Sequence, residues 1–249
     1  MDKGTAVVTG AGTRLGRAIA KALGEDGWAM ALHYNSSAEG AEELAAELRD
    51  RGGRAEPVQQ DLSDYANAGR LIDRAAEALG GPVRVLVNSA STFDKDSLSD
   101  MTAETWHKLL DVNAAAPAFL MSAMAKQADG AGGAIVNILD TQLDAPSPNR
   151  FSYFVGKAAL EMATRLAALD LAGQGIRVNA VAPGLVLPTG QTQEQYEARQ
   201  AKTPLGVGLG PDDIVAAVRY LIAAPQVTGQ VLRVDGGQSL MGFGNSKVG

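Results

Sequence analysis

Residues 5–16 read TAVVTGAGTRLG, and this stretch decides the fold. Thr5–Thr9 is a short, apolar, β-branched run that predicts a buried strand, and a glycine-rich turn follows at once. The next residues, RAIAKALGEDG, have a helical pattern closed by Gly24 and Gly27. Between a strand and a helix, glycines let the backbone approach a phosphate at the helix N-terminus. The stretch therefore predicts a dinucleotide-binding unit, and a plain connecting turn is the alternative.

The alternation of strand and helix continues along the chain. Apolar runs predict strands at 28–34, 54–60, 83–88, 133–139, 175–181 and 230–234, and helical patterns cover 38–53, 64–81, 102–128, 151–172 and 211–223. This order predicts one α/β domain over residues 1–249. We expect a doubly wound (Rossmann-type) parallel sheet of about seven strands, with helices on both faces and ligand at the carboxyl ends of the strands. The polar segment 185–203, interrupted by Pro and Gly, predicts a mobile substrate cover.

Composition narrows the function classes. The chain has 249 residues, a formal net charge of -6 and 46% hydrophobic residues, without basic clusters or a run as long as a membrane span. Nucleic acid and anionic membrane are therefore not expected as partners, and the cytoplasm is the expected location. Without cysteine, and with only His33 and His107, a disulfide framework, a metal cage and a Ser-His-Asp hydrolase are also not expected.

The end of the second strand bears on cofactor choice. It reads His33, Tyr34, Asn35, Ser36, Ser37, with no acid before Glu39, whereas enzymes that select NAD usually place a carboxylate here. Hydroxyl and amide donors without a repelling carboxylate favour NADPH, although no arginine clamp is present. Ser36 and Ser37 equally suit helix N-cap positions.

Tyr153 and Lys157 stand four residues apart at the start of a long apolar helix, so both share one face. Moving a Tyr pKa from ~10 toward ~7 requires roughly 4 kcal/mol of preference for the phenolate. One ammonium at about 4 Å supplies that order of energy at an effective dielectric of ~20. The pair predicts an acid–base group, and a surface Lys beside a core Tyr is the alternative.

Other residues near these motifs have two interpretations each. Arg14 in the glycine turn points toward pyrophosphate or an electron-rich substrate, or is a solvated loop residue. Asp61 accepts from an adenine amino group or caps the next helix. Phe93 makes a flat wall for a planar ring or packs in the core. Asn113 satisfies backbone groups or holds a water near Tyr153 and Lys157.

Taken together, these motifs resemble those of the short-chain dehydrogenase/reductase family along essentially the whole chain. The motifs are the glycine turn Thr9–Gly16, Asp61, Asn88–Ala90, Asn113, Tyr153 with Lys157, Arg177–Ala180, Pro183-Gly184 and Val234–Gly237. The resemblance implies hydride transfer from a nicotinamide, with Tyr153 as proton donor. It also implies that Lys157 lowers the Tyr153 pKa and holds the nicotinamide ribose, that Asn113 fixes a relay water, and that the chain forms a homotetramer.

Departures from the common family pattern narrow the resemblance to one branch. Asp140 stands where most members carry serine, and Arg14 where most carry glycine. With Ser91, Phe93 and the turn at His33-Tyr34, they resemble the pteridine reductase and dihydromonapterin reductase branch. The resemblance implies a pterin between nicotinamide and Phe93, flanked by Arg14 and Asp140. The chain departs from that branch at Asn35-Ser36, which lacks a basic residue, and at Asn88-Ser89.

The sequence thus predicts an NADPH-dependent reductase of a pterin-like substrate of the dihydropteridine, dihydromonapterin or dihydrofolate type. A carbonyl reductase of the same fold, acting on a ketone, quinone or 3-oxoacyl substrate, is the first alternative, and a non-catalytic NADP(H) sensor the second. The expected catalytic residues are Asp140, Tyr153, Lys157 and Asn113. The expected substrate contacts are Arg14, Ser91, Phe93, Asp140 and Tyr153, and no metal site is expected. The expected cofactor contacts are Gly10, Thr13, Arg14, Leu15, Gly16, His33, Tyr34, Asn35, Ser36, Ser37, Asp61, Leu62, Asn88, Ser89, Ala90, Tyr153, Lys157, Pro183, Gly184 and Val186.

Overall fold

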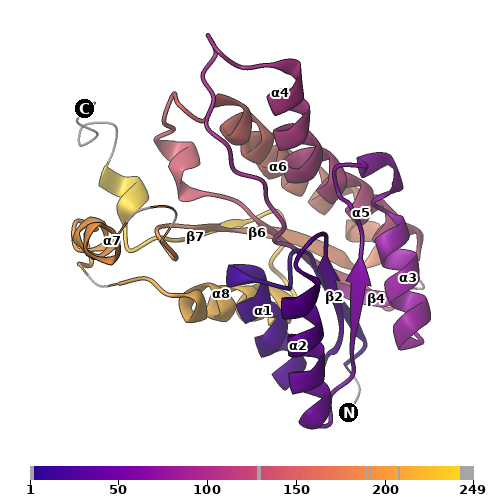
Figure 1. The fold of residues 1–249 in the computed structure, drawn as a ribbon. Coiled ribbons are helices and arrows are strands. Elements are labelled where there is room, and N and C mark those ends of the chain that lie inside the picture. The colour runs from indigo at the N-terminus through magenta and orange to yellow at the C-terminus, as the bar shows by residue number, and fades with distance from the viewer. Residues whose placement is uncertain (1–2, 128–129, 189, 191, 207, 242–249) are drawn as a thin grey trace.

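The computed structural model describes residues 3–127, 130–188, 190, 192–206 and 208–241. Its centre is one open sheet of seven parallel strands in the order β3-β2-β1-β4-β5-β6-β7 (Figure 1). The strand order reverses between β1 and β4, where a crevice forms at the carboxyl ends. The predicted doubly wound sheet is confirmed. Its strands are β1 (Thr5–Val8), β2 (Ala29–Tyr34), β3 (Ala55–Gln59), β4 (Val83–Asn88), β5 (Gly133–Ile138), β6 (Ile176–Pro183) and β7 (Val231–Val234).

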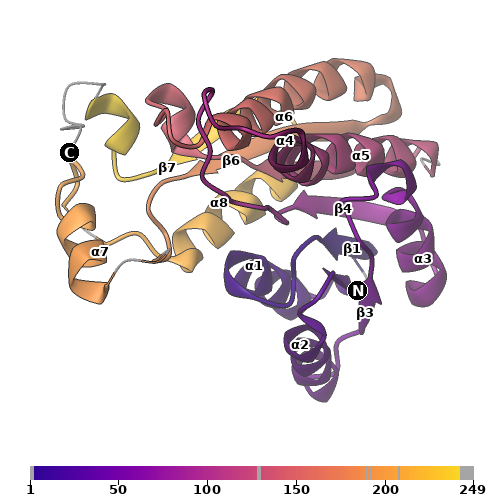
Figure 2. The same cartoon turned by 45° about the horizontal axis from the view of Figure 1, so that its top comes forward.

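Helices cover both faces of the sheet, as Figure 2 shows. One layer contains α1 (Arg14–Glu25), α2 (Ala38–Asp50) and α8 (Pro211–Ala223). The opposite layer contains α3 (Arg70–Leu79), α4 (Ala103–Leu110), α5 (Ala116–Lys126) and α6 (Phe151–Asp170).

The core lies in two slabs, one on each side of the sheet. Because successive side chains of a strand point to opposite faces, Val8 packs into the slab with α1 and α8, while Val7 packs into the slab with α3 and α5. All four residues of β1 are buried. Because both faces are covered, the central strands are rich in apolar residues, and this pattern allowed their prediction from the sequence.

Two predicted helices differ from the structure. The run predicted as one helix over 102–128 is interrupted by a π-helix at Asp111–Ala115, which separates α4 from α5; Ala128 lies outside the described residues. A π-bulge adds a residue to a turn and is common at functional sites. The helix predicted from residue 64 begins at Arg70, because Tyr65–Asn67 forms a separate 3₁₀ turn.

The segment 185–203, which was predicted as a mobile substrate cover, contains a helix, α7 (Gln193–Gln200). Thr192 and Gln195 form a capping box at its N-terminus. Tyr196 donates to the carbonyl of Leu185 at 3.1 Å, which ties the helix to the end of β6. Residues 189 and 191 of the segment lie outside the described residues. Across the described part of the chain, no helix has the length and apolar character needed to cross a membrane.

Candidate active site

A cavity of ≈ 760 Å³ opens where the strands end, between the loops after β1, β4, β5 and β6. It brings together most of the predicted site residues, which come from distant parts of the chain. Those lining it are Gly10, Thr13, Arg14, Leu15, Gly16, His33, Asn35, Ser36, Ser37, Asp61, Leu62, Ser89, Ala90, Ser91, Phe93, Asp140, Tyr153, Lys157, Pro183, Gly184 and Val186.

Three predicted residues do not line the cavity: Tyr34, Asn88 and Asn113. Tyr34 follows His33 on β2, and successive side chains of a strand point to opposite faces. Asn88 is 2% exposed, and its amide donates to Oδ1 of Asn137 on β5 at 2.8 Å. The amide group of Asn88 is therefore bonded within the sheet, its Oδ1 has no hydrogen-bond partner, and its predicted contact with the cofactor stays a prediction.

The glycine turn is held close to its neighbours. A methyl group at Gly16 would meet the carbonyl of Gly10, and one at Gly12 would meet the side chain of Ser37. Oγ1 of Thr9 accepts from the backbone N–H groups of Ser89 and Ala90, each at 2.9 Å. Thr13 occupies the N-cap of α1 without a side-chain bond, so the first N–H groups of α1 stay available for an anion.

Arg14 has a φ of 52°, and it is the one non-glycine residue with positive φ in the part of the chain that the structure describes. Such a conformation costs roughly 1 kcal/mol or more outside glycine, so it indicates a functional constraint. The Arg14 guanidinium donates to the carbonyl of Pro188 at 3.1 Å. Arg14 therefore reaches from the glycine turn to the segment after β6, and it lines the cavity on the way.

His33 is buried and links the glycine turn to the end of β3 by hydrogen bonds. The Gly10 N–H donates to Nδ1 of His33 at 3.0 Å, so the ring proton is on Nε2, which donates to the Gln60 carbonyl at 2.9 Å. Burial lowers the pKa of His33 to about 4. His33 was predicted as a cofactor contact; as a neutral ring with both nitrogens bonded, its role is to fix the turn.

The loop between β2 and α2 contributes Asn35, Ser36 and Ser37 to the cavity wall. No Lys or Arg of this loop lines the cavity. Ser37 occupies the N-cap of α2, but its side chain makes no capping bond, which leaves its hydroxyl free for a ligand. Asp61 also borders the cavity, and its Oδ1 accepts from the N–H and hydroxyl of Ser63 at 2.9 and 2.8 Å. Asp61 therefore stabilises the turn at Ser63 and does not cap the next helix, because Asp64 and Gly69 occupy the N-caps of the 3₁₀ turn and of α3.

Tyr153 and Lys157 lie on the same face of α6 and are 5% and 2% exposed. Tyr153 donates to Oδ2 of Asp140 at 3.0 Å. The ammonium of Lys157 donates to the carbonyl of Ile138 at 2.8 Å and lies 5.9 Å from the centroid of the Tyr153 ring. The first partner of the phenol is therefore the carboxylate of Asp140.

This arrangement reverses the expected direction of one pKa. We expected Lys157 to lower the pKa of Tyr153, but burial, and then the charge and hydrogen bond of Asp140, raise it well above 10.0. Burial also raises the pKa of Asp140 and lowers that of Lys157 to about 8. The phenol consequently keeps its proton at neutral pH, and the raised pKa makes it a weaker acid than an unperturbed tyrosine.

Phe93 is an exposed wall of the cavity, 40% accessible, and is not a core residue. Its ring meets the edge of Tyr153, with centroids 4.7 Å apart and planes at 85°. The guanidinium carbon of Arg150 lies 4.0 Å from the Phe93 centroid. An aromatic wall, a phenol and a cation thus converge on one end of the cavity.

Asn113 lies in the π-helix with 0% exposure. Its Oδ1 accepts from the Ser91 hydroxyl at 2.6 Å, and its amide donates to the carbonyl of Thr92 at 2.9 Å. The side chain of Asn113 therefore holds the loop that carries Phe93. Asn113 therefore satisfies a backbone group, which was one of its two interpretations, and the relay water stays a prediction.

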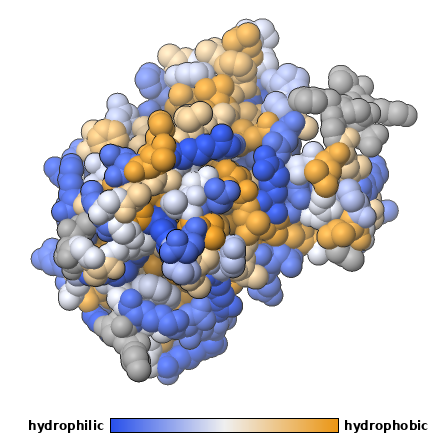
Figure 3. Space-filling model, turned by 180° about the vertical axis from the view of Figure 1, so that it is seen from behind, coloured by the Kyte–Doolittle hydropathy of each residue, from blue (hydrophilic) through white to orange (hydrophobic). Residues whose placement is uncertain are grey.

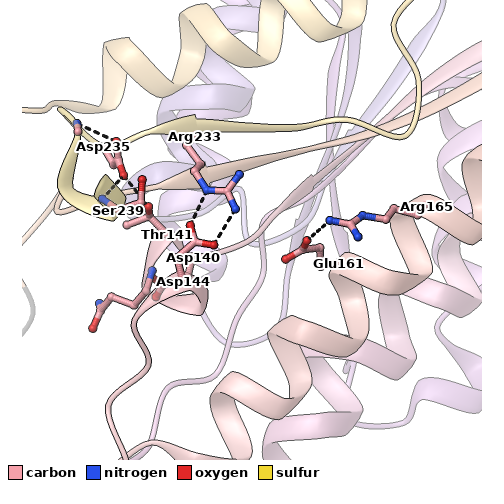
Figure 4. Close-up of polar contacts among 10 residues, drawn as sticks. Asp140, Thr141, Asp144, Glu161, Arg165, Arg233, Asp235 and Ser239 are labelled. Carbon is pink, nitrogen blue, oxygen red and sulfur yellow. Dashed lines mark hydrogen bonds and ion pairs between the residues drawn. The ribbon is translucent and has the colours of Figure 1, made fainter. Parts of the chain in front are cut away.

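The turn after Asp140 is held by contacts with the last strand, β7, and with the residues that follow it (Figure 4). Oδ1 of Asp140 accepts from the N–H of Gln142 at 2.8 Å. Thr141 donates to Oδ2 of Asp235 at 2.7 Å, and Arg233 makes a two-pronged ion pair with Asp144. Two tertiary contacts thus fix the direction in which the Asp140 carboxyl faces the cavity.

Sequence reasoning missed Arg150 and Arg199, which both line the cavity. Arg150 is the residue before α6 and stands three positions before Tyr153, and this spacing is the sequence signal that indicates its place near the phenol. Arg199 lies on α7, in the segment that was predicted to cover the substrate. Within the described residues, no group of three or more His, Asp or Glu side chains is arranged to hold a metal ion.

The geometry and the comparisons with known proteins agree on the class of protein. A family model described as enoyl-(acyl carrier protein) reductase matches residues 10–239. The chain belongs to the short-chain dehydrogenase/reductase family of oxidoreductases.

Particular relatives are similar over almost the full chain. The crystal structure of FolM alternative dihydrofolate reductase 1 from Brucella suis, solved with NADP, is 36% identical, covers 96% of each chain and has a TM-score of 0.91. Pteridine reductase 1 of Leishmania tarentolae is 36% identical over 94% of this chain and 96% of its own. Cis-4-hydroxycyclohexanecarboxylate dehydrogenase of Sinomonas cyclohexanicum is 34% identical over 93% of this chain and 95% of its own.

Proposed function

We propose that this chain is an NADPH-dependent reductase of a pterin-like ring of the dihydropteridine, dihydromonapterin or dihydrofolate type. One observation carries the proposal: the Asp140 carboxyl faces the cavity and is bonded to the phenol of Tyr153. An aminopyrimidine ring presents N–H donors that a carboxylate accepts in a charge-assisted pair. The similarity to FolM of Brucella suis and to pteridine reductase 1 supports this assignment.

The residues at the glycine end fit NADPH. Neighbouring atoms leave no room for a side chain at Gly12 or Gly16, so glycine is needed at both positions. The first N–H groups of α1 can donate to the pyrophosphate of the cofactor. Asn35, Ser36 and Ser37 offer uncharged donors to a 2′-phosphate without a repelling acid. When bound, the reduced nicotinamide supplies the hydride for a C=N bond of the substrate ring.

The residues at the end of the cavity away from the glycine turn bind the substrate ring and donate a proton to it. Phe93 gives a flat surface for the ring, held in place by Asn113 through Ser91 and Thr92. Asp140 accepts from the N–H groups of the ring and fixes its orientation. Tyr153, protonated at neutral pH, donates to the ring nitrogen beside the carbon that receives the hydride.

Lys157 has a separate task in this proposal. Its ammonium is fully inside the site and anchored on the Ile138 carbonyl, with its pKa lowered by burial to about 8. It holds a ribose hydroxyl of the cofactor and restores the proton of Tyr153 after turnover.

Two further features belong to the same proposal. We infer that residues 185–203 cover the substrate, since Arg14 already contacts the carbonyl of Pro188 across the cavity mouth. We also infer a homotetramer. Figure 3 shows hydrophobic patches on the face seen from behind, and α6 exposes Met162, Leu166 and Leu169 to 53%, 59% and 79%. Their spacing places them on one face of the helix, a suitable surface for a second copy.

The direct test is steady-state turnover of the purified protein with NADPH and dihydropterins, measured against simple ketones and quinones. The proposal expects a kcat/KM for a dihydropterin well above that for any ketone or quinone. Reduction of ketones alone would favour the carbonyl reductase, which the similarity to cis-4-hydroxycyclohexanecarboxylate dehydrogenase supports. NADPH binding without turnover of any compound would favour the sensor.

A further inference from the structure

Two arginines stand at the substrate end of the cavity without a carboxylate partner among the described residues. Arg150 stacks on Phe93, with its guanidinium carbon 4.0 Å from the ring centroid. Arg199 projects from the exposed side of α7 and lines the same cavity. One turn away on α7 it has Gln195, so no acid at that helical spacing neutralises it.

The acids of this region are already engaged. Asp140 accepts from Tyr153 and Gln142 through its two oxygens. Asp144 is paired with Arg233, and Asp235 accepts from Thr141. None of these bonds reaches Arg150 or Arg199.

The two guanidinium groups also oppose one another. Burial lowers the pKa of Arg150, the negative charge of Asp140 acts in the other direction, and the positive charge of Arg199 lowers it further. Arg199 is therefore near enough for its charge to act on Arg150, and both guanidinium groups line the one cavity, where an anion could contact both. The pair is therefore preorganised for a negatively charged ligand.

That anion is not part of the cofactor. The phosphate-binding features, the N-terminus of α1 and Ser36 with Ser37, lie at the glycine end. Arg150 lies instead over Phe93, whose ring touches Tyr153, the proton donor. An anion held by Arg150 and Arg199 would belong to the molecule that is reduced.

We propose that Arg150 and Arg199 bind a carboxylate-bearing tail of the substrate, so that the preferred substrate is a reduced pterin with an anionic extension. This inference rests on the proposed pterin reductase activity. The planar guanidinium fork matches a carboxylate through two parallel hydrogen bonds. Because Arg150 stacks on Phe93, its guanidinium lies beside the proposed binding site of the pterin ring. Arg199 on α7 provides a second guanidinium from the segment 185–203.

The test compares dihydrofolate, whose glutamate tail is anionic, with dihydromonapterin, which has no carboxylate. Both are measured at saturating NADPH, and the readout is the ratio of their kcat/KM values. Arg199→Gln should lower the dihydrofolate to dihydromonapterin ratio about tenfold, in line with loss of a charged hydrogen bond. Arg199→Lys, which keeps the charge, should restore part of it. Lys202→Gln removes a charge from the same segment outside the cavity and should leave the ratio unchanged.

Salt gives an independent readout. Because exposed charges are screened, added salt should lower kcat/KM for dihydrofolate more than for dihydromonapterin, and Arg199→Gln should reduce that difference. An unchanged ratio in Arg199→Gln, with both compounds reduced, would overturn the tail site and leave the pterin reductase standing. Failure of the wild type to reduce either compound would overturn both.

Discussion

The phenol of Tyr153 donates to Oδ2 of Asp140 at 3.0 Å, and this bond sets the acid–base character of the site. Both groups are buried, and the pKa of each is raised. Because two acids that share a hydrogen bond titrate as a coupled unit, the second ionisation of the pair is strongly disfavoured. In the resting protein the proton therefore stays on the phenol.

Replacing Tyr153 by Phe removes the proposed proton donor while keeping the ring against Phe93. We expect kcat to fall by about 10²–10⁴-fold, because general acid catalysis contributes that much. NADPH affinity, measured by fluorescence titration, should stay nearly unchanged. Tyr220→Phe, at an exposed position on α8, is the matched control and should keep full activity. Near-normal turnover of Tyr153→Phe would mean that the proton comes from another group.

The fold was predictable from the sequence because its information is local. A buried parallel strand such as β1 is apolar along its length, and a glycine turn followed by a helix is visible without tertiary structure. The interruption of the 102–128 helix was not predictable, since a π-helix at Asp111–Ala115 depends on Asn113 bonding to a distant loop.

Most residues that line the cavity could be predicted from the sequence, but Arg150, Arg199 and the hydrogen-bond partner of Tyr153 could not. Spacing on α6 brings Lys157 to the same face as Tyr153, and we expected the two to interact most strongly. The contact that dominates, between Tyr153 and Asp140, crosses the turn before α6 and depends on how that turn is anchored to Asp235. Nothing in local periodicity specifies such a turn.

His33 predicts a pH dependence of stability. Its pKa is lowered to about 4 in the folded protein, so the unfolded chain binds a proton first as pH falls below ~6.5. The stabilisation by neutral His33 is thus present above ~6.5 and is lost toward pH 4, by up to about 3 kcal/mol. Chemical denaturation across this range should show a smaller loss for His33→Gln than for wild type.

The other histidine provides the control for that experiment. His107 has a side chain that is 71% accessible, so His107→Gln should follow the wild-type pH profile. If His33→Gln and wild type lose stability in parallel between pH 6.5 and 4, then His33 is not held neutral beneath the glycine turn.

Cofactor choice should depend on the uncharged corner at Ser36. We expect wild type to have a higher kcat/KM with NADPH than with NADH, by a modest factor because no arginine of that loop lines the corner. Ser36→Asp should shift the ratio toward NADH by roughly tenfold, or about 1.4 kcal/mol, through repulsion of the 2′-phosphate. Ser99→Asp adds the same charge on an exposed loop and should not change the ratio. A wild-type preference for NADH would contradict this interpretation.

A change at Asp140 should distinguish reduction of a pterin ring from reduction of a ketone. A ketone that accepts hydride becomes an alkoxide, which a hydroxyl at this position would stabilise by donating a hydrogen bond. An ionised carboxylate would repel the developing charge. A ring with N–H donors has the opposite requirement, since it needs an acceptor that Asp140 supplies and a serine supplies only weakly.

Asp140→Ser should therefore lower kcat/KM for a dihydropterin far more than it lowers any activity on a simple ketone or quinone. Loss of one charge-assisted pair predicts a drop of at least about tenfold for the dihydropterin. Both substrates are measured with the same NADPH concentration and pH, so that only the substrate differs. Asp170→Ser removes an exposed carboxylate at the C-terminal end of α6, which neither lines the cavity nor contacts the turn after Asp140, so it should leave the ratio of the two activities unchanged. Equal losses on both substrates in Asp140→Ser, or a faster dihydropterin reaction, would remove the substrate-specific role of the carboxylate and make the ketone reductase the better assignment.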